Sequence, residues 1–566
     1  QFISSFSSQT QHVILNEKCR EHAWVIPTAL KQRIKLNYLD SEVFPLYDRL
    51  KLLPPPDQIP PVEKTGDSSK KSRSSVKAPE HSHTQHQHQH HQASNSNAQT
   101  QKQSKMIYAD NLMKIHIQPK GGMIDTSEKV DPVNVEELLK ELTQDHILMD
   151  LIHHAQKLVN KDKAKLPETT TSPSIVNGDI EADEIVFLGT SGAAATKIRG
   201  ETCILVRIRG YGNIILDCGE GGFNQLTACF GLEKANQILK DLKCVFISHK
   251  HADHMRGTVQ LLTRRRDLLG LPSTHNTTNS NINNNHLKQI INPISFCQHR
   301  CKQCLAPFCA ESSLTRHVLI HDEQLMKDLY DKDVSNANGG AQEATFVAEE
   351  TASREYGFFP ENLVVIGSMW LETFLSEYNF VEPLYYSFVD CDELLYTRPS
   401  PNPTLADYFA RELGVKIQSV QVIHSFPTYG AVLERIVKDS SEEPWKVCFS
   451  GDTRPCEDLV RAGQNATVLI HEANFEEDMA HKAVKDRHST TQEASVVGRR
   501  MNANLTVLTH FSTRLEGRVP SLKHVELEPN KIVFAFDFMH VRLNSKLKEL
   551  PFLVPPQQHM FQLDKQ

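Results

Sequence analysis

The sequence lacks any run of apolar residues long enough to span a lipid bilayer, and it shows no secretory signal pattern. We therefore expect an intracellular protein without a membrane partner. Cysteine is sparse, with 12 in 566 residues, and this favours a reducing compartment over a disulfide framework. An excess of positive charge is also missing, because the formal net charge is −7. Any contact with RNA must then come from local basic patches rather than from a global field.

The chain also lacks an initiator methionine and begins at Gln1, so we expect it to be part of a longer protein. Residues 22–55 mix apolar and polar positions and predict a small folded piece that runs into a linker. Residues 61–105 contain almost nothing to bury, which predicts a disordered linker. Their histidine-rich tract at 81–91 has the residue type to bind metal loosely, but a solvated repeat without function is the simpler interpretation. Apolar residues at near-helical spacing over 134–160 predict one or two amphipathic helices.

From about residue 183 the sequence alternates between short apolar runs and helical segments, which is typical of layered α/β proteins. A helix is predicted at 223–240. Residues 270–350 interrupt the pattern, and their Asn-rich stretches indicate an insertion. The predicted strands lie at 185–188, 203–208, 214–217, 244–247, 363–366, 417–424, 431–437, 446–450, 467–470, 505–509 and 531–536.

A cluster of metal-ligand residue types follows the predicted strand 244–247. It consists of His249, His251, Asp253 and His254. Two of these histidines are separated by one residue, so both point the same way while the chain is extended. The last two ligands lie past the turn and can face a second ion. Imidazole nitrogen and carboxylate oxygen suit Zn²⁺ and related ions, so the cluster predicts a two-metal hydrolase. A polar loop with surface histidines is the alternative, which the agreement of ligand type and position disfavours.

Four later segments each offer a further candidate for the same site. They are His424 after an apolar run, Asp452 after a glycine, His488 at a predicted helix start, and His510 after another apolar run. Ser489 or Thr490 can cap the helix that follows His488. Taken singly, each candidate has a structural interpretation, as a packed histidine or a turn aspartate. Together with residues 249–254, they favour one shared site.

These motifs resemble those of the metallo-β-lactamase superfamily and, within it, those of tRNase Z, the tRNA 3′-processing endonuclease, in its long eukaryotic form. The matching motifs are residues 249–254, Leu216–Gly221, Ser450–Thr453, His471–Ala473, His488–Thr490 and Thr509–Ser512. Three more segments are similar to the long form: Lys35–Asn37, Val43–Leu46 and Val533–Met539. The resemblance is strong over 183–270 and 360–555, patchy over 22–55 and 106–175, and absent over 61–105 and most of 270–350.

The resemblance implies an αβ/βα four-layer sandwich with disordered and inserted segments. The domains expected from it are 1–60 as the remnant of an amino-terminal half-domain, 61–105 as linker, 106–175 as a helical connection, 176–555 as the catalytic domain with its insertion at about 270–350, and 556–566 as tail. The long form carries a tRNA-binding arm on its amino-terminal half-domain, and we expect most of that half to be missing here.

The resemblance also implies two zinc ions, for which Mn²⁺ or a similar ion can substitute. The implied ligands are His249, His251 and His424 for one ion, Asp253, His254 and His510 for the other, and Asp452 as the bridge. Asp253 would also accept a proton from the attacking water. His488, oriented by Glu472, would contact the phosphate and protonate the leaving oxygen. Asp217 would support a metal-binding histidine.

The implied substrate is precursor tRNA, and the implied products are a tRNA with a free 3′-hydroxyl and a trailer with a 5′-phosphate. No nucleotide cofactor is expected, and the relatives imply a nuclear or mitochondrial location. The family usually carries a Pro-x-Lys-x-Arg-Asn loop after the first strand. Here Lys197 and Arg199 remain as candidates for phosphate contact, while the Pro and Asn positions are Ala195 and Gly200.

Two further clusters have open interpretations. Cys301, Cys304, His317 and His321 have zinc-like spacing inside the insertion, although the family offers no precedent for a structural zinc there. Arg264–Arg266 can meet phosphates or form a solvated helix face, and we favour the second. Two other functions also remain: a two-metal hydrolase of another phosphodiester, and a truncated non-catalytic paralogue. Retention of Lys197, Arg199 and His488 argues against the first, and retention of every ligand argues against the second.

Overall fold

The computed structural model divides the chain into two compact units. The first comprises Gln1–Leu30 and Pro54–Asn134, and it contains two pairs of short strands. β1 (His12–Ile14) runs parallel to β2 (Met106–Tyr108), and β3 (Lys114–His116) runs antiparallel to β4 (Met123–Asp125). The second unit comprises Lys31–Leu53 and Val135–Gln566 and holds every candidate ligand that is described.

The described residues are 12–14, 27–46, 106–108, 114–116, 123–125, 133–163, 182–273, 299–300, 307–308, 363–398, 403–438, 443–515, 517–522 and 531–562. The predicted linker at 61–105 and the Cys301, Cys304, His317 and His321 cluster lie outside them. Of the insertion, two short strands are described, β10 (His299–Arg300) and β11 (Pro307–Phe308), which pair antiparallel.

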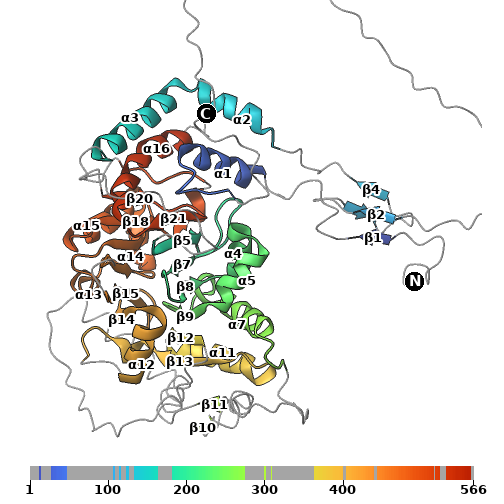
Figure 1. The fold of residues 1–566 in the computed structure, drawn as a ribbon, viewed down its shortest axis with the longest axis vertical. Coiled ribbons are helices and arrows are strands. Elements are labelled where there is room, and N and C mark those ends of the chain that lie inside the picture. Colours follow the sequence, from blue (N-terminus) through green and yellow to red (C-terminus); the bar gives the residue numbers. More distant parts are fainter. Residues whose placement is uncertain are drawn as a thin grey trace, which may run out of the picture. The chain divides into compact units, whose positions relative to one another are not determined.

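The first large sheet of the second unit has seven strands in the order β13-β12-β9-β8-β7-β5-β21 (Figure 1). These strands are β13 (Tyr386–Asp390), β12 (Leu363–Gly367), β9 (Leu242–Phe246), β8 (Asn213–Cys218), β7 (Cys203–Arg207), β5 (Glu184–Gly189) and β21 (Met539–Arg542). The pairings among β13, β12, β9 and β8 are parallel. The pairings of β8 with β7, of β7 with β5 and of β5 with β21 are antiparallel.

The second large sheet has six strands in the order β14-β15-β16-β17-β18-β20. They are β14 (Val415–Gln421), β15 (Tyr429–Arg435), β16 (Lys446–Phe449), β17 (Val468–Glu472), β18 (Leu505–Thr509) and β20 (Ile532–Phe534). The first two pairings are antiparallel, and those from β16 to β20 are parallel. Both sheets are therefore mixed.

Alternate side chains along a strand enter different hydrophobic cores, which shows the order of the layers. On β5, Ile185 and Phe187 join a core that also contains residues of the second sheet, whereas Val186 and Leu188 face a separate core under helices. On β17, Ile470 faces the shared core and Leu469 faces helices on the far side. The order is thus helices, sheet, sheet, helices, and the predicted αβ/βα sandwich is confirmed.

Helices cover both outer faces of the sandwich (Figure 1). The first sheet is covered by α4 (Gly222–Phe230), α5 (Leu232–Lys240), α7 (Gly257–Leu268) and α11 (Met369–Val381), and the second by α13 (Glu457–Ala462) and α15 (Thr491–Arg500). The single helix predicted at 223–240 is wrong, because Gly231, with φ 77°, separates α4 from α5. Most predicted strands are present, whereas β13 and β21 were not predicted.

The amphipathic segment 134–160 forms two helices, as predicted: α2 (Val135–Gln144) and α3 (His146–Lys163). Leu142 and Leu148 enter the shared core. Near the carboxyl end, α16 (Val554–Gln562) occupies much of the segment expected to be a tail. In the described part of the chain, no helix has the length and apolar character needed to cross a bilayer.

Candidate metal centre

The predicted ligand cluster lies where β9 ends and α6 (Ala252–Met255) begins. His249 and His251 follow the strand, and Asp253 and His254 belong to the short helix. The other three candidates follow strands of the second sheet: His424 after β14, Asp452 after β16 and His510 after β18. Strand ends from the two sheets therefore deliver all seven side chains to one region of the sandwich.

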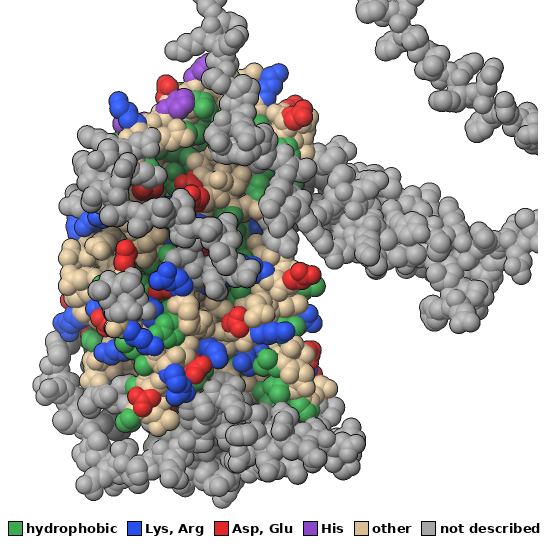
Figure 2. Space-filling model, viewed as in Figure 1, with side chains coloured by type: hydrophobic (Ala, Val, Ile, Leu, Met, Phe, Trp, Pro, Cys, Tyr) green, Lys and Arg blue, Asp and Glu red, His purple; other side chains and the backbone are tan. Residues whose placement is uncertain are grey.

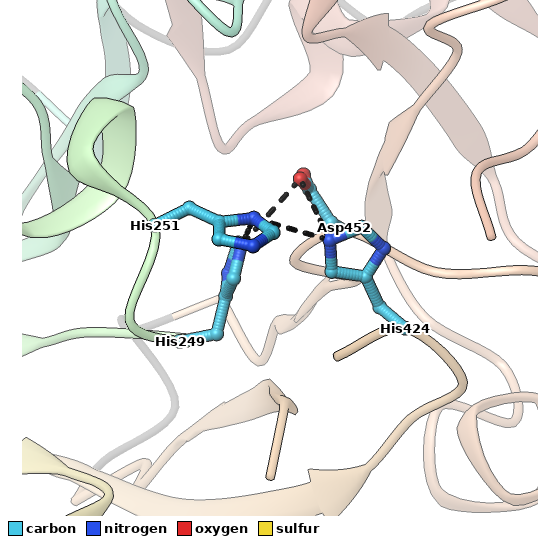
Figure 3. A group of neighbouring side chains, drawn as sticks. All are labelled: His249, His251, His424 and Asp452. Atoms are coloured by element: carbon cyan, nitrogen blue, oxygen red, sulfur yellow. Dashed lines mark hydrogen bonds and ion pairs between the residues drawn. The ribbon is translucent and has the colours of Figure 1, made fainter. Parts of the chain in front are cut away.

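One group of four side chains gathers around the carboxylate of Asp452 (Figure 3). Asp452 Oδ2 lies 3.6 Å from His249 Nε2 and 3.8 Å from His424 Nε2. His251 Nδ1 completes the group at 2.8 Å from His249 Nε2 and 3.3 Å from His424 Nε2. His251 is exposed and the other three are buried, so the group opens to solvent on the side of His251.

A second group consists of Asp253, His254 and His510, which are all buried. His254 Nε2 and His510 Nε2 are 3.1 Å apart, and each lies 3.4 Å from Asp253 Oδ2. Asp452 borders this group as well, because its Oδ2 is 3.4 Å from His254 Nε2 and its Oδ1 is 3.3 Å from His510 Nε2. Asp452 therefore contacts imidazoles of both groups.

The separations between these atoms fit a bound divalent cation. Four tetrahedral bonds of about 2.1 Å place the ligand atoms about 3.4 Å apart. The contacts of Asp452 with the imidazoles of four candidate ligands range from 3.3 to 3.8 Å. In addition, Asp452 Oδ1 is buried without a hydrogen-bond partner, an arrangement that is costly unless a cation satisfies the oxygen. The nitrogen and oxygen donors are those that zinc binds.

Desolvation prepares three of the histidines as neutral ligands. It lowers the pKa of His249 well below its ordinary value, and it lowers the pKa of His251 to about 4. Burial also lowers the pKa of His424. At neutral pH these imidazoles are unprotonated, which is the form that coordinates a metal.

Three carboxylates give the surroundings of His254 a preference for positive charge. Burial alone would lower the pKa of His254, but Asp452, Asp217 and Asp253 together raise it well above its ordinary value. Asp217 is closest, since His254 Nδ1 donates to Asp217 Oδ2 over 2.6 Å and leaves Nε2 toward the second group. The backbone N–H and the hydroxyl of Ser248 each donate to Asp217 over 2.7 Å. Asp217 thus fixes the ring of His254, in the position predicted for it.

Other contacts orient the remaining imidazoles, and the sequence did not predict them. His424 Nδ1 donates to the backbone oxygen of Arg487 over 2.9 Å, and Asn474 Nδ2 lies 3.3 Å from His510 Nδ1. Ser248 directly precedes His249, and Asn474 directly follows the His471–Ala473 motif, and these positions are the only signal that marks them. Arg487 likewise directly precedes His488, but its contribution comes from a backbone atom, which the residue type does not indicate.

His488 and Glu472 form a charged pair beside the two groups. Their Nδ1 and Oε1 atoms are 2.9 Å apart. Two backbone N–H groups hold the carboxylate, with Thr453 N donating over 2.8 Å and Asn474 N over 3.2 Å. Burial opposes charge on His488, but Glu472, assisted by Asp452, raises its pKa to about 9. His488 is therefore protonated at neutral pH and can donate a proton to a bound group.

The two basic candidates of the loop after β5 lie in different surroundings. Lys197 is exposed and free to reach a ligand. Arg199 is only 3% exposed, and its Nη1 donates to Thr190 Oγ1 over 2.7 Å and to the Ala535 oxygen over 3.0 Å. In this conformation Arg199 is not placed for the predicted contact with phosphate, because its guanidinium is buried, with Nη1 bonded inside the protein and with Nε and Nη2 enclosed without a hydrogen-bond partner.

The solvated helix face predicted for Arg264–Arg266 is also wrong for two of its residues. Arg265 and Arg266 are buried on α7. Arg266 is paired with Asp267 at 2.7 Å and with Glu382 at 2.6 Å. Arg266 thus ties α7 to the segment that follows α11, and the buried positions of both arginines disfavour contact with a substrate.

Comparisons with known proteins agree with this geometry. The family described as Anti-Pycsar protein Apyc1 matches residues 184–269. The chain is 29% identical to "tRNAse Z TRZ4, mitochondrial" of Arabidopsis thaliana, over 79% of this chain and 44% of that protein. It is 26% identical to "Ribonuclease Z, mitochondrial" of Drosophila melanogaster, over 96% of this chain and 54% of that protein.

The chain is also 26% identical to human "Zinc phosphodiesterase ELAC protein 2", over 99% of this chain and 50% of that protein. It thus spans about half the length of the curated relatives it matches. Among solved structures, a long form RNase Z from yeast superposes with a TM-score of 0.57 at 18% identity, covering 98% of this chain and 63% of that chain. This structural likeness supports the same fold.

Proposed function

We propose that this chain, a homologue of long-form tRNase Z with the metallo-β-lactamase fold, is a zinc-dependent endoribonuclease that removes the 3′ trailer from precursor tRNA. The observation that carries the proposal is the position of Asp452 between two groups of imidazoles, beside the protonated His488. This arrangement suits phosphodiester hydrolysis. That reaction requires an activated nucleophile, stabilisation of a negatively charged transition state and protonation of the leaving oxygen at one site.

Two zinc ions are part of the proposal. His249, His251 and His424 would hold one, and Asp253, His254 and His510 would hold the other, with Asp452 shared. Bound there, the ions would supply a water of lowered pKa and neutralise negative charge on the phosphate. We also propose Mn²⁺ as a substitute.

The protein's own groups would then direct the proton transfers. Asp253 would accept a proton from the attacking water, while the backbone N–H of Ala193 holds Asp253 Oδ2 over 2.6 Å. A bond forms between the water oxygen and phosphorus, and the bond from phosphorus to the 3′-oxygen of the tRNA breaks. His488 would give that oxygen its proton, because Glu472 keeps His488 charged. The tRNA leaves with a 3′-hydroxyl, and the phosphate stays on the trailer.

Recognition of the RNA would depend on local contacts. On the face shown in Figure 2, Lys and Arg side chains lie interspersed with acidic ones, in keeping with the net charge of −7. Lys197 is an exposed cation on the loop after β5, and we propose that it contacts a phosphate of the RNA. Two relatives are named as mitochondrial, so a mitochondrial or nuclear location belongs to the same proposal.

The decisive experiment incubates the purified protein and Zn²⁺ or Mn²⁺ with a precursor tRNA that carries a labelled 3′ trailer. We expect cleavage directly after the discriminator base, and no cleavage by Asp253→Ala at equal folding. A wild-type protein that holds metal and leaves the precursor intact would overturn the proposal. Activity on small phosphodiesters alone would favour the second candidate, a hydrolase of another phosphodiester, which Ala195 and Gly200 in the recognition loop also favour.

A further inference from the structure

Asp537 has no place among the candidate ligands, yet it ties the loop after β5 at both ends. Its Oδ1 accepts a hydrogen bond from Thr190 Oγ1 over 2.7 Å, and its Oδ2 accepts one from Gly200 N over 2.6 Å. The loop begins at Thr190 and closes at Gly200. One carboxylate from the segment after β20 therefore fixes the span of the loop 190–200.

Arg199 strengthens this tie from inside the loop. Its Nη1 donates to Thr190 Oγ1, the same hydroxyl that donates to Asp537. Its guanidinium carbon lies 4.6 Å from the ring centre of Phe511 and 5.1 Å from that of Phe536. The buried arginine supplies a positive charge near Asp537, which offsets part of the cost of burial; burial still raises the pKa of Asp537 to about 6.

The loop that Asp537 holds reaches the metal centre directly. The backbone N–H of Ala193 donates to Asp253 Oδ2 over 2.6 Å, and Ala193 has φ 69°, a conformation that alanine rarely adopts. The neighbouring β6 (Ser191–Gly192) pairs with β19 (Phe511–Ser512), directly after His510. A Cβ on Gly192 would come within 2.9 Å of the His510 ring. The loop is therefore packed against two candidate ligands.

The amino-terminal segment 31–46 supports Asp537 from the other side. On α1 (Pro27–Leu39), the Arg33 guanidinium carbon lies 3.6 Å from the ring centre of Phe538. Phe44 packs edge-on against Phe536, with ring centres 6.0 Å apart. The N–H of His540 donates to the backbone oxygen of Val43 over 2.8 Å. The residues on both sides of Asp537 are thus held by segment 31–46.

We propose that Asp537 is a positioning residue: by tying Thr190 to Gly200, it sets the Ala193 N–H against Asp253 and presents Lys197 to the substrate, while segment 31–46 braces it. The role of Lys197 rests on the proposed function, which supplies the RNA substrate. The link from Asp537 to Asp253 rests on the observed hydrogen bonds alone.

The test compares Asp537→Asn with Glu184→Gln in the full chain. Asparagine keeps the shape but turns an amide N–H₂ toward one of the two donors, so one tie is lost. Glu184 is a matched control, because it is also a paired carboxylate, at 2.6 Å from Arg207 and 3.2 Å from His540, and makes no contact with the loop. We expect Asp537→Asn to lower kcat on bis(4-nitrophenyl) phosphate by about tenfold or more, since small misplacements of reacting groups are costly.

Precursor tRNA, as a second substrate, separates the effect of Asp537 on Asp253 from its effect on Lys197. On precursor tRNA, Asp537→Asn should lower kcat and raise KM, whereas Lys197→Ala should raise KM only. Equal kinetics of Asp537→Asn and Glu184→Gln, at equal metal content, would overturn the positioning role. If the wild type hydrolyses the small ester and leaves tRNA intact, the proposed function fails, yet the comparison on the ester still decides the role of Asp537.

Two further measurements apply when the variant does not fold or when no substrate is turned over. If Asp537→Asn does not fold, Thr190→Val removes the hydroxyl that donates to Asp537 and accepts from Arg199, and it is judged against the same control. If no substrate is turned over, the proteins are loaded with Co²⁺ and their visible absorption bands are compared. A band shift in Asp537→Asn that Glu184→Gln lacks supports a displaced Asp253, and identical spectra overturn it.

Discussion

Asp452 combines more contacts with candidate ligands than any other carboxylate among the described residues. Both of its oxygens face imidazoles, at 3.3–3.8 Å, and the one without a hydrogen bond is buried. A full negative charge in such a position is stable only when positive charge balances it. A substitution of Asp452 alone is therefore a direct test of metal binding at this site.

Asp452→Asn should lose most of the metal and nearly all of the activity. The substitution keeps the shape but removes the charge, and it offers one oxygen where the two groups share two. We expect kcat to fall by at least about 100-fold, in line with the loss of a bridging ligand. Metal content by mass spectrometry and trailer cleavage are the measurements. Asp458→Asn, an exposed carboxylate on α13, serves as the control and should retain both metal and activity.

His488 predicts an alkaline limit to activity. Its pKa is raised to about 9, mainly by Glu472, so the protonated form that donates to the leaving oxygen is lost as the pH rises through that value. Glu472→Gln removes the stabilising charge, and the alkaline limb of the kcat–pH profile should move to lower pH. The profile of each protein, measured between pH 6 and about 10 with Zn²⁺ held constant, checks this. An unmoved limb in a metal-loaded Glu472→Gln protein would contradict the role of His488 as the acid.

At the scale of elements, the sequence predicts the strands better than it predicts the contacts made at their carboxyl ends. Apolar runs predict β5, β9 and β18, because buried strands of both sheets are apolar on both faces. The convergence of His254 with His510 is not a local property, since 256 residues separate them and their Nε2 atoms lie 3.1 Å apart. Residue types at the ends of apolar runs favour one shared site, and the family resemblance assigns these two side chains to the same ion.

Side-chain direction is the feature of these elements that the sequence predicts least. Lys197 and Arg199 alternate in a short loop, and the family resemblance implies both as candidates for phosphate contact. In the structure the first is exposed, and the second is buried against Thr190 and Ala535. The difference comes from Asp537 and two phenylalanines that are distant in sequence, so no local pattern contains it.

The start of α15 illustrates an element whose local signal does suffice. Thr490 accepts a hydrogen bond from Glu493 N over 3.1 Å, and Glu493 accepts one from Thr490 N over 2.9 Å, which completes a capping box directly after His488. Thr490→Ala should destabilise the protein by about 1 kcal/mol, measured by urea unfolding. Thr490→Ser retains the cap and should stay close to wild type. Equal losses in both variants would show that packing of the methyl group matters more than the cap.

At the scale of the whole molecule, residues 31–46 belong to the unit that holds the candidate ligands, although residues 54–134, which follow in sequence, are grouped with the other unit. Residues 31–53 are grouped with 135–566, and Leu36 and Phe44 lie in the core shared by the two sheets. The sequence predicts a small folded piece here, but not its partner. That partner is the segment after β20, which only the folded chain brings alongside.

Phe44→Ala tests whether this segment is integral to the fold. Phe44 is 4% exposed and packs against Phe536, so its truncation should cost about 3–5 kcal/mol of unfolding free energy. Phe380→Ala is the matched control, because the same side chain is 58% exposed on α11 and its loss should cost little. Urea unfolding of both variants gives the comparison. If Phe44→Ala is as stable as Phe380→Ala, segment 31–46 is dispensable for folding, and its bracing of Asp537 loses its physical basis. A loss confined to Phe44→Ala, accompanied by lower kcat at equal metal content, would instead link the amino-terminal segment to the chemistry at Asp253.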